Sequence, residues 1–216
     1  MTDNRSLQQA VLDELDWEPS VHSADIGVTA NDGVVTLTGH VGSYAEKIAA
    51  ERATGRVSGV KAVAEELEVR YPSALKQGDD DIAKWALQVL SWDINVPKDT
   101  VKIKVEKGFV TLSGDVDWYY QRSAAEADVR KLHGVIGVTD NIKIKPSVQA
   151  SDVRAKIEAA LKRNAQIEAD NITVRADGGK VTLTGKVETW YDRNLAKRTA
   201  WSAPGVTQVD DRLTIG

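Results

Sequence analysis

Three places in the chain combine an aromatic side chain with a basic one a few residues further on. The first has Tyr44 and Lys47, and the two later places are richer: Trp118, Tyr119, Tyr120 and Arg122, then Trp190, Tyr191 and Arg193. Rings beside a cation suit a bilayer interface, where the ring is half buried and the cation meets a phosphate. They suit a protein interface equally well. We therefore expect these seven later residues to bind lipid or a protein partner, unless one aromatic per place only caps a core and the others cover a linker.

A single carboxylate recurs further along the chain, as Glu65, Asp140 and Asp211. One interpretation is a side chain that accepts backbone N–H bonds at a turn or bulge. The other is one ligand of a small-cation site completed by carbonyl oxygens, as a hard ion prefers. One carboxylate at each place is too few to assign a metal ligand, so we predict no metal and no cofactor, and the cation interpretation stays open.

No set of residues has the spacing of a catalytic site. The three histidines, His22, His40 and His133, fall at unrelated positions, and no serine lies in a nucleophile elbow. The glycines form no phosphate-cradling signature. We therefore expect no catalytic residue and no enzymatic activity.

The amino-acid composition limits the classes of partner that the protein is expected to bind. The 216 residues include 42% hydrophobic and 28% charged residues and no cysteine, which describes an ordinary globular chain without a disulfide framework. Acidic and basic residues number 12 and 6 in residues 1–75, 11 and 11 in 76–146, and 9 and 11 in 147–216, so the net charge of −4 is the sum of −6, 0 and +2. A nucleic-acid binder would be basic throughout, so we expect no nucleic acid.

The N-terminus has neither the apolar run of a signal peptide nor a lipid-attachment cysteine. No window approaches the roughly 18 apolar residues of a membrane span. The sequence therefore predicts a cytoplasmic protein without a transmembrane segment, or a periplasmic one if a leader was removed. The oligomeric state and the relative orientation of the parts stay open.

The elements that must position these residues come from a threefold repeat. The glycine-flanked strand at residues 33–41 returns at 108–116 and at 179–187, after offsets of 75 and 71 residues. Its alternation of apolar and hydroxyl side chains is typical of a strand with one buried face. Before it, each repeat has an apolar i, i+4, i+8 stripe that indicates an amphipathic helix: Leu7, Val11 and Leu15; Ile82, Ala86 and Leu90; Val153, Ile157 and Leu161.

Each repeat reads as α-β-β-α-β. Second helices are expected at 44–57, 119–132 and 190–203, and the aromatic and basic residues lie at their starts. The sequence therefore predicts an α+β protein of three tandem α-β-β-α-β domains, each a three-stranded mixed sheet with two helices packed on one face. The predicted domains are 1–70, 78–145 and 149–216, joined by short linkers with Pro72 and Pro146.

Three sets of glycines are predicted to be structural. Gly33, Gly108 and Gly179 lie where a tight hairpin turn is expected. Gly59, Gly134 and Gly205 are expected at the position after the end of the second helix. Gly39, Gly114 and Gly185 interrupt the buried parity of the strand, so we expect each to make room for the alanine-rich second helix.

This pattern resembles the BON domain, and the resemblance covers all three repeats. It is carried by the Ile-x-Val strand, the motif Gly-x-Val-Thr-Leu-[ST]-Gly-x-Val, the alanine-rich helix and the closing Val-x-x-x-[LI]-x-[VI] strand. The resemblance implies the same α-β-β-α-β fold. Tandem units of this kind occur in envelope proteins, some induced by osmotic stress and some anchored as lipoproteins, and some bind anionic phospholipid. One relative that joins such a unit to a LysM segment senses potassium.

We therefore interpret the chain as a binding or scaffolding protein that contacts anionic phospholipid peripherally, in stress or envelope maintenance. A protein-interaction or self-assembly module is the first alternative. A small-cation sensor of the potassium type is the second.

Overall fold

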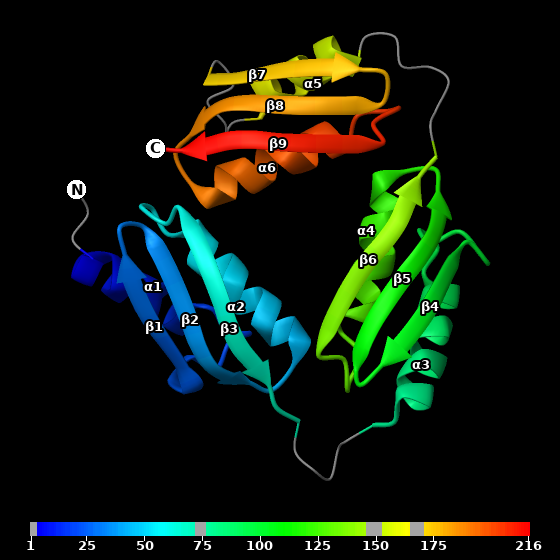
Figure 1. The fold of residues 1–216 in the computed structure, drawn as a ribbon, viewed down its shortest axis with the longest axis horizontal. Helices are drawn as coiled ribbons and strands as arrows, with labels where there is room; N and C mark the ends of the chain where they lie inside the picture. Colours follow the sequence, from blue (N-terminus) through cyan, green and yellow to red (C-terminus); the bar gives the residue numbers. More distant parts are fainter. Residues whose placement is uncertain (1–3, 72–76, 146–152, 165–170) are drawn as a thin grey trace.

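A computed structural model describes residues 4–71, 77–145, 153–164 and 171–216 (Figure 1). Within these ranges the chain forms three successive α-β-β-α-β units, as predicted. Most of both predicted linkers, including Pro72 and Pro146, lies outside the described residues.

The elements occur in the same order in each unit. Unit one has α1 (Asn4–Trp17), a short 3-10 turn η1 (Ser23–Asp25), β1 (Ile26–Asn31), β2 (Val34–Val41), α2 (Tyr44–Arg56) and β3 (Ala62–Val69). Unit two has α3 (Asp79–Trp92), β4 (Val101–Glu106), β5 (Phe109–Val116), α4 (Tyr119–Val129) and β6 (Gly137–Ile144). Unit three has α5 (Val153–Arg163), β7 (Ile172–Asp177), β8 (Lys180–Val187), α6 (Trp190–Trp201) and β9 (Gln208–Ile215).

Each sheet is mixed, and its middle strand carries the glycine-flanked motif. In unit one, β1 pairs antiparallel with β2 and β2 pairs parallel with β3; the other units repeat both pairings in the same register. The parallel pairing follows from the helix that intervenes between the two strands. The opposite face of each sheet, with its threonine and serine side chains, carries no helix of its own unit (Figure 1).

Both helices pack on the apolar face of the sheet. The stripe residues predicted for the first helices are buried in all three units, as are Val35, Leu37 and their equivalents on the middle strands. Each unit has its own cluster of twelve buried residues, drawn from both helices and one parity of the strands. The amphipathic pattern is therefore sufficient to place the core of each unit.

The glycine of the hairpin turn packs against the glycine that precedes the last strand. Asp32 and Gly33 both have positive φ, at 50° and 88°, as a two-residue hairpin turn requires. Gly59 lies in a second turn, closed by the bond from Val60 N to Val57 O, and its φ of 91° makes glycine the favoured residue there. A Cβ on Gly33 would lie 3.0 Å from the carbonyl oxygen of Gly59, so the two turns pack backbone to backbone.

The other units repeat this contact through Gly108 with Gly134 and Gly179 with Gly205. The prediction that Gly59, Gly134 and Gly205 directly follow the helix was wrong. The helices end at Arg56, Val129 and Trp201, so two to four residues separate each helix from its glycine. These glycines are needed by the turn that leads into the last strand.

The prediction that Gly39, Gly114 and Gly185 make room for the second helix was also wrong. Gly39 has a φ of 111°, and a Cβ there would collide with the carbonyl oxygen of Asp25, at the start of the neighbouring strand. Gly114 and Gly185 have φ values of 134° and 125° and meet the carbonyl oxygens of Thr100 and Asn171 in the same way. A backbone conformation and a close strand approach, rather than an alanine of the helix, require glycine here.

The second helices begin as the sequence predicts. Ser43 accepts a hydrogen bond from the backbone N–H of Glu46, and Thr189 and Asp192 form a reciprocal capping box. These caps fix where the helix starts. They therefore also fix the direction of its first residue, which is Tyr44, Tyr119 or Trp190.

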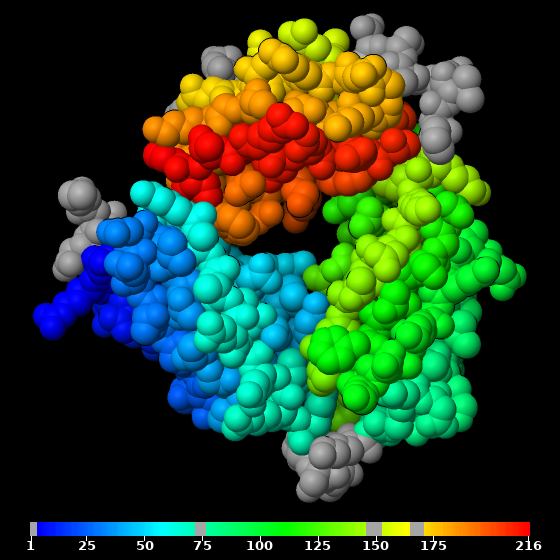
Figure 2. All heavy atoms as spheres, in the orientation of Figure 1, coloured from blue at the N-terminus to red at the C-terminus, as the bar shows by residue number. Residues whose placement is uncertain are grey.

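The three units surround a common centre, with α2, α4 and α6 turned towards it (Figure 1). The space-filling view is hollowed at this point, between the cyan, green and orange parts of the chain (Figure 2). The starts of the second helices therefore lie at the junctions between units.

Candidate functional site

The first residue of each second helix reaches the next unit. Tyr44, Tyr119 and Trp190 occupy the same position of the repeat. Tyr44 of unit one packs against the core of unit two, together with Tyr119 of that unit. Burial raises the pKa of the Tyr44 hydroxyl, which is also hydrogen-bonded to the backbone of Val138.

Tyr71 adds a second contact between units one and two. Its hydroxyl donates to the carbonyl oxygen of Val135 at 2.9 Å, and its ring lies edge-on to His133 with centroids 4.6 Å apart. Two tyrosines of unit one thus end on backbone groups of unit two.

Tyr119 makes the corresponding contact between units two and three. Its ring stacks on Trp201, at the end of α6, with centroids 4.9 Å apart and planes inclined by 13°. Trp201 packs against the cores of both unit two and unit three. Such an offset aromatic pair adds about 0.5–1.5 kcal/mol beyond its buried area.

Trp190 closes the circle between units three and one. Its half-buried ring lies over Gly55 in α2, where an added Cβ would come 2.7 Å from Cδ1 of the indole. Gly55 of unit one and Trp201 of unit three occupy the same position of the repeat. Trp201 fills the junction between units two and three, whereas Gly55 leaves room for Trp190 at the junction between units three and one. The contacts run from unit one to two, from two to three, and from three back to one.

A repeated ion pair holds the base of each second helix to the last strand. Lys47 contacts Glu65 at 2.9 Å, Arg122 contacts Asp140 at 2.7 Å, and Arg193 contacts Asp211 at 2.9 Å. The same carboxylates also accept the backbone N–H two residues further on, from Leu67, Ile142 and Leu213. The two arginines lie over indole rings, Arg122 at 5.9 Å from Trp201 and Arg193 at 5.2 Å from Trp190.

These contacts agree with the first interpretation of Glu65, Asp140 and Asp211. The carboxylates accept backbone N–H bonds and neutralise a basic side chain of their own unit. In the part of the chain that the structure describes, no three His, Cys, Asp or Glu residues form a group that could hold a metal.

The predicted binding residues therefore divide into two groups. Tyr119, Arg122, Trp190 and Arg193 are half buried in contacts within the molecule. Trp118, Tyr120 and Tyr191 are exposed by 42%, 56% and 39%. The structure thus places Tyr119, Arg122 and Trp190 at junctions between units, whereas Arg193 contacts Asp211 and Trp190 of its own unit.

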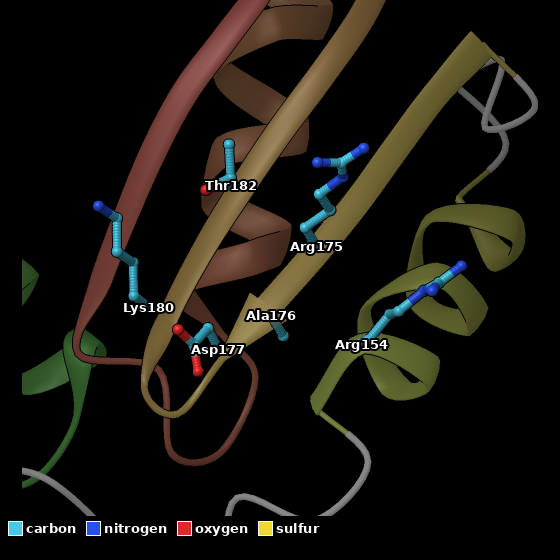
Figure 3. Close-up of a pocket in the computed structure, with 6 residues that line it drawn as sticks. All are labelled: Arg154, Arg175, Ala176, Asp177, Lys180 and Thr182. Atoms are coloured by element: carbon cyan, nitrogen blue, oxygen red, sulfur yellow. The ribbon is translucent and has the colours of Figure 1, made fainter.

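Sequence reasoning missed a basic groove on unit three. Arg175 and Lys180 lie on the β7–β8 hairpin, with Arg154 on the neighbouring helix α5 (Figure 3). With Ala176, Asp177 and Thr182 these residues line a hollow of about 580 Å³. The signal was present in two outward-facing strand positions, where unit one has Thr29 and Val34 and unit three has the bases Arg175 and Lys180.

Three exposed apolar side chains on unit two were also missed. Leu87, Trp92 and Ile94, in and just after α3, are exposed by 58%, 75% and 96%. Trp17, at the position of Trp92 in unit one, is exposed by 81%. Their places off the buried stripe could have indicated this exposure.

None of the described helices has both the length and the apolar character needed to cross a membrane.

Comparisons with known proteins place these units in a family. Osmotically-inducible protein Y of Escherichia coli (strain K12) is 32% identical over 148 residues, which cover 66% of this chain and 73% of the relative. Two solved structures of CdsD, a structural protein of the type III secretion system of Chlamydia trachomatis, are 16% and 18% identical. They cover 96% and 100% of this chain and 91% and 98% of their own, with TM-scores of 0.28 and 0.26, too low to support an argument.

The family model described as the BON domain matches residues 3–71, 78–146 and 149–216, one match for each unit of the structure. The chain therefore belongs to the BON-domain family, with three tandem copies of the domain.

Proposed function

We propose that the protein is a non-enzymatic binding protein that attaches peripherally to anionic phospholipid surfaces through its third unit. The observation that carries this proposal is the basic groove of Arg154, Arg175 and Lys180 (Figure 3). Guanidinium and ammonium groups around a hollow suit the phosphate of a lipid headgroup. The similarity to an osmotically inducible protein supports a place for this binding in the response to stress.

The groove replaces the start of α6 as the surface proposed for lipid. Arg193 is occupied by Asp211 and Trp190 lies against unit one, so neither is presented to a headgroup. Arg154 contacts Glu158 at 2.7 Å, whereas the ion pairs of the described residues include none to Arg175 or Lys180. Those two side chains are therefore the ones available to a phosphate.

Sedimentation of the full chain with vesicles tests this proposal. At low salt we expect binding to anionic but not to zwitterionic vesicles. Basic side chains are attracted by anionic headgroups, and salt screens this attraction. The double substitution Arg175→Glu and Lys180→Glu should abolish it. The matched control is Lys61→Glu with Arg70→Glu, which changes the net charge equally on the exposed surface of unit one. A wild-type chain that stays in the supernatant, or equal loss in both double variants, would overturn the proposal.

A second candidate function is self-association through exposed apolar side chains of unit two. Leu87, Trp92 and Ile94 expose large apolar surfaces of the kind found at the centres of protein interfaces. Sedimentation velocity over a range of concentrations should then show a dimer that Trp92→Ser with Ile94→Ser removes. A chain that remains monomeric at every concentration would rule out this candidate.

A further inference from the structure

The three second helices enclose a pocket at the centre of the molecule. Residues of α2, α4 and α6 line a volume of about 440 Å³, at the hollow visible in Figure 2. This volume lies within the range of roughly 300–1,000 Å³ that is usual for small-molecule sites. The pocket exists only because the three units close on one another, so no single unit contains it.

Its walls carry an excess of positive charge. Arg52 of unit one, Arg130 of unit two, and Lys197 and Arg198 of unit three all line it, against Glu51 and Glu126. Arg56, a further lining residue, is held by Glu14 and Glu18 at 2.8 and 3.0 Å. Arg130 contacts Glu126 at 3.0 Å, but the ion pairs of the described residues include none to Arg52, Lys197 or Arg198.

The cationic groups are close enough to affect one another. Burial lowers the pKa of Arg52, and the charges of Arg130 and Arg198 lower it further. Burial also raises the pKa of the Glu51 carboxyl, so the folded state disfavours its negative charge. The Nε of Arg130 is buried and has no hydrogen-bond partner within the described structure.

We propose that this central pocket binds a small phosphate-bearing anion. Phosphate oxygens match the fork of a guanidinium group, and three arginines from three units converge here. The rings of Tyr119 and Trp190 form part of the wall and restrict the site to compact ligands. The anion joins the three units through charge and thereby stabilises their closed arrangement. This site is separate from the groove on unit three and does not depend on lipid binding there.

The experiment uses the full chain and pyrophosphate, with inorganic phosphate as the smaller probe and chloride at equal ionic strength as the reference. Pyrophosphate should raise the melting temperature by about 3–5 °C at a tenfold excess over its Kd. It should also change tryptophan fluorescence saturably, because Trp190 lines the pocket. The double variant Arg52→Gln with Arg198→Gln should lose both responses. The variant Arg70→Gln with Arg212→Gln removes the same charge from exposed residues outside the pocket and should keep both responses.

The melting temperature without anion separates loss of binding from loss of folding. Because Arg52 and Arg198 repel each other, their removal should leave this temperature unchanged or raise it. The proposal is overturned if the wild-type chain responds no more to pyrophosphate than to chloride, or if the Arg52 and Arg198 double variant responds equally. Vesicle sedimentation of that variant should match the wild type. A fluorescence change with anionic vesicles alone, lost in the same variant, would assign the phosphate to a lipid headgroup.

Discussion

Units one and three have the same fold but open sheet faces of opposite charge. Where unit one has Glu66, unit three has Arg212, and where unit one has Thr29 and Val34, unit three has Arg175 and Lys180. The residues on the buried faces, in contrast, remain apolar in both. Packing against two helices constrains one face of the sheet, whereas the other is free to change. Differences between units on the open face are therefore the best guide to binding.

Substituting the strand glycine that units one and three share should destabilise both units equally. Replacing Gly39 or Gly185 by Ala places a Cβ against a strand carbonyl at a positive φ, so we expect each to lower the free energy of unfolding by about 3 kcal/mol. Urea denaturation monitored by circular dichroism measures both. A large loss at one glycine and none at the other would show that the two frames are not equivalent.

The basic residues of unit three should confer vesicle binding when they are introduced at the equivalent positions of unit one. Introducing Thr29→Arg and Val34→Lys gives unit one the bases of unit three at exposed positions. In a chain that lacks the unit-three groove through Arg175→Glu and Lys180→Glu, this should restore part of the vesicle affinity, by about 1 kcal/mol for each base. Vesicle titration at low salt measures the gain. No recovery would mean that the shape of the groove matters more than its charge.

The ion pairs at the base of the second helix should differ only slightly between units. Arg193 and Asp211 are exposed by 27% and 13%, and Lys47 and Glu65 by 21% and 23%. Arg193→Ala also removes the contact with Trp190, so we expect it to cost about 1–2 kcal/mol and Lys47→Ala rather less. Thermal unfolding compares the two. A greater loss for Lys47→Ala would contradict the added role of the indole.

The smallest expected effect is a change in the pH dependence of stability at Glu51, the position at which unit three has Lys197. Burial, with a lesser contribution from Glu65, raises the pKa of the Glu51 carboxyl. The folded state therefore favours the protonated acid, and its stabilising contribution is lost as pH rises through that raised pKa. Relative to wild type, Glu51→Gln should gain melting temperature from about pH 4 to pH 7. A difference that is constant with pH would refute this.

Much of the fold follows from local patterns. The stripe of Leu7, Val11 and Leu15 and the alternation of Val35 and Leu37 report which side chains leave water, and both patterns recur in each unit. The hairpin at Asp32 and Gly33 could be predicted because few residues tolerate positive φ at both positions. The reason for Gly39 could not, because the carbonyl it approaches belongs to a neighbouring strand.

The candidate sites were less predictable. A pattern of apolar residues indicates that a ring is buried but not which unit buries it. Tyr44, Tyr119 and Trp190 were visible as equivalent positions, but their partners, including Trp201 and Gly55, lie in other units. Likewise, the recurrence of Glu65, Asp140 and Asp211 was apparent, and only the structure shows that each faces a base.

By itself, the sequence determined the three α-β-β-α-β units, their mixed sheets and their buried faces, because periodic burial within one unit is a local property of the chain. The tertiary structure alone decided that the three units close into a ring, and that three of the seven predicted binding residues, Tyr119, Arg122 and Trp190, lie at its junctions. It also created the central pocket, because Arg52, Arg130 and Arg198 converge only when α2, α4 and α6 face one centre. Contacts between units depend on rigid-body placement, which no periodicity within a unit records.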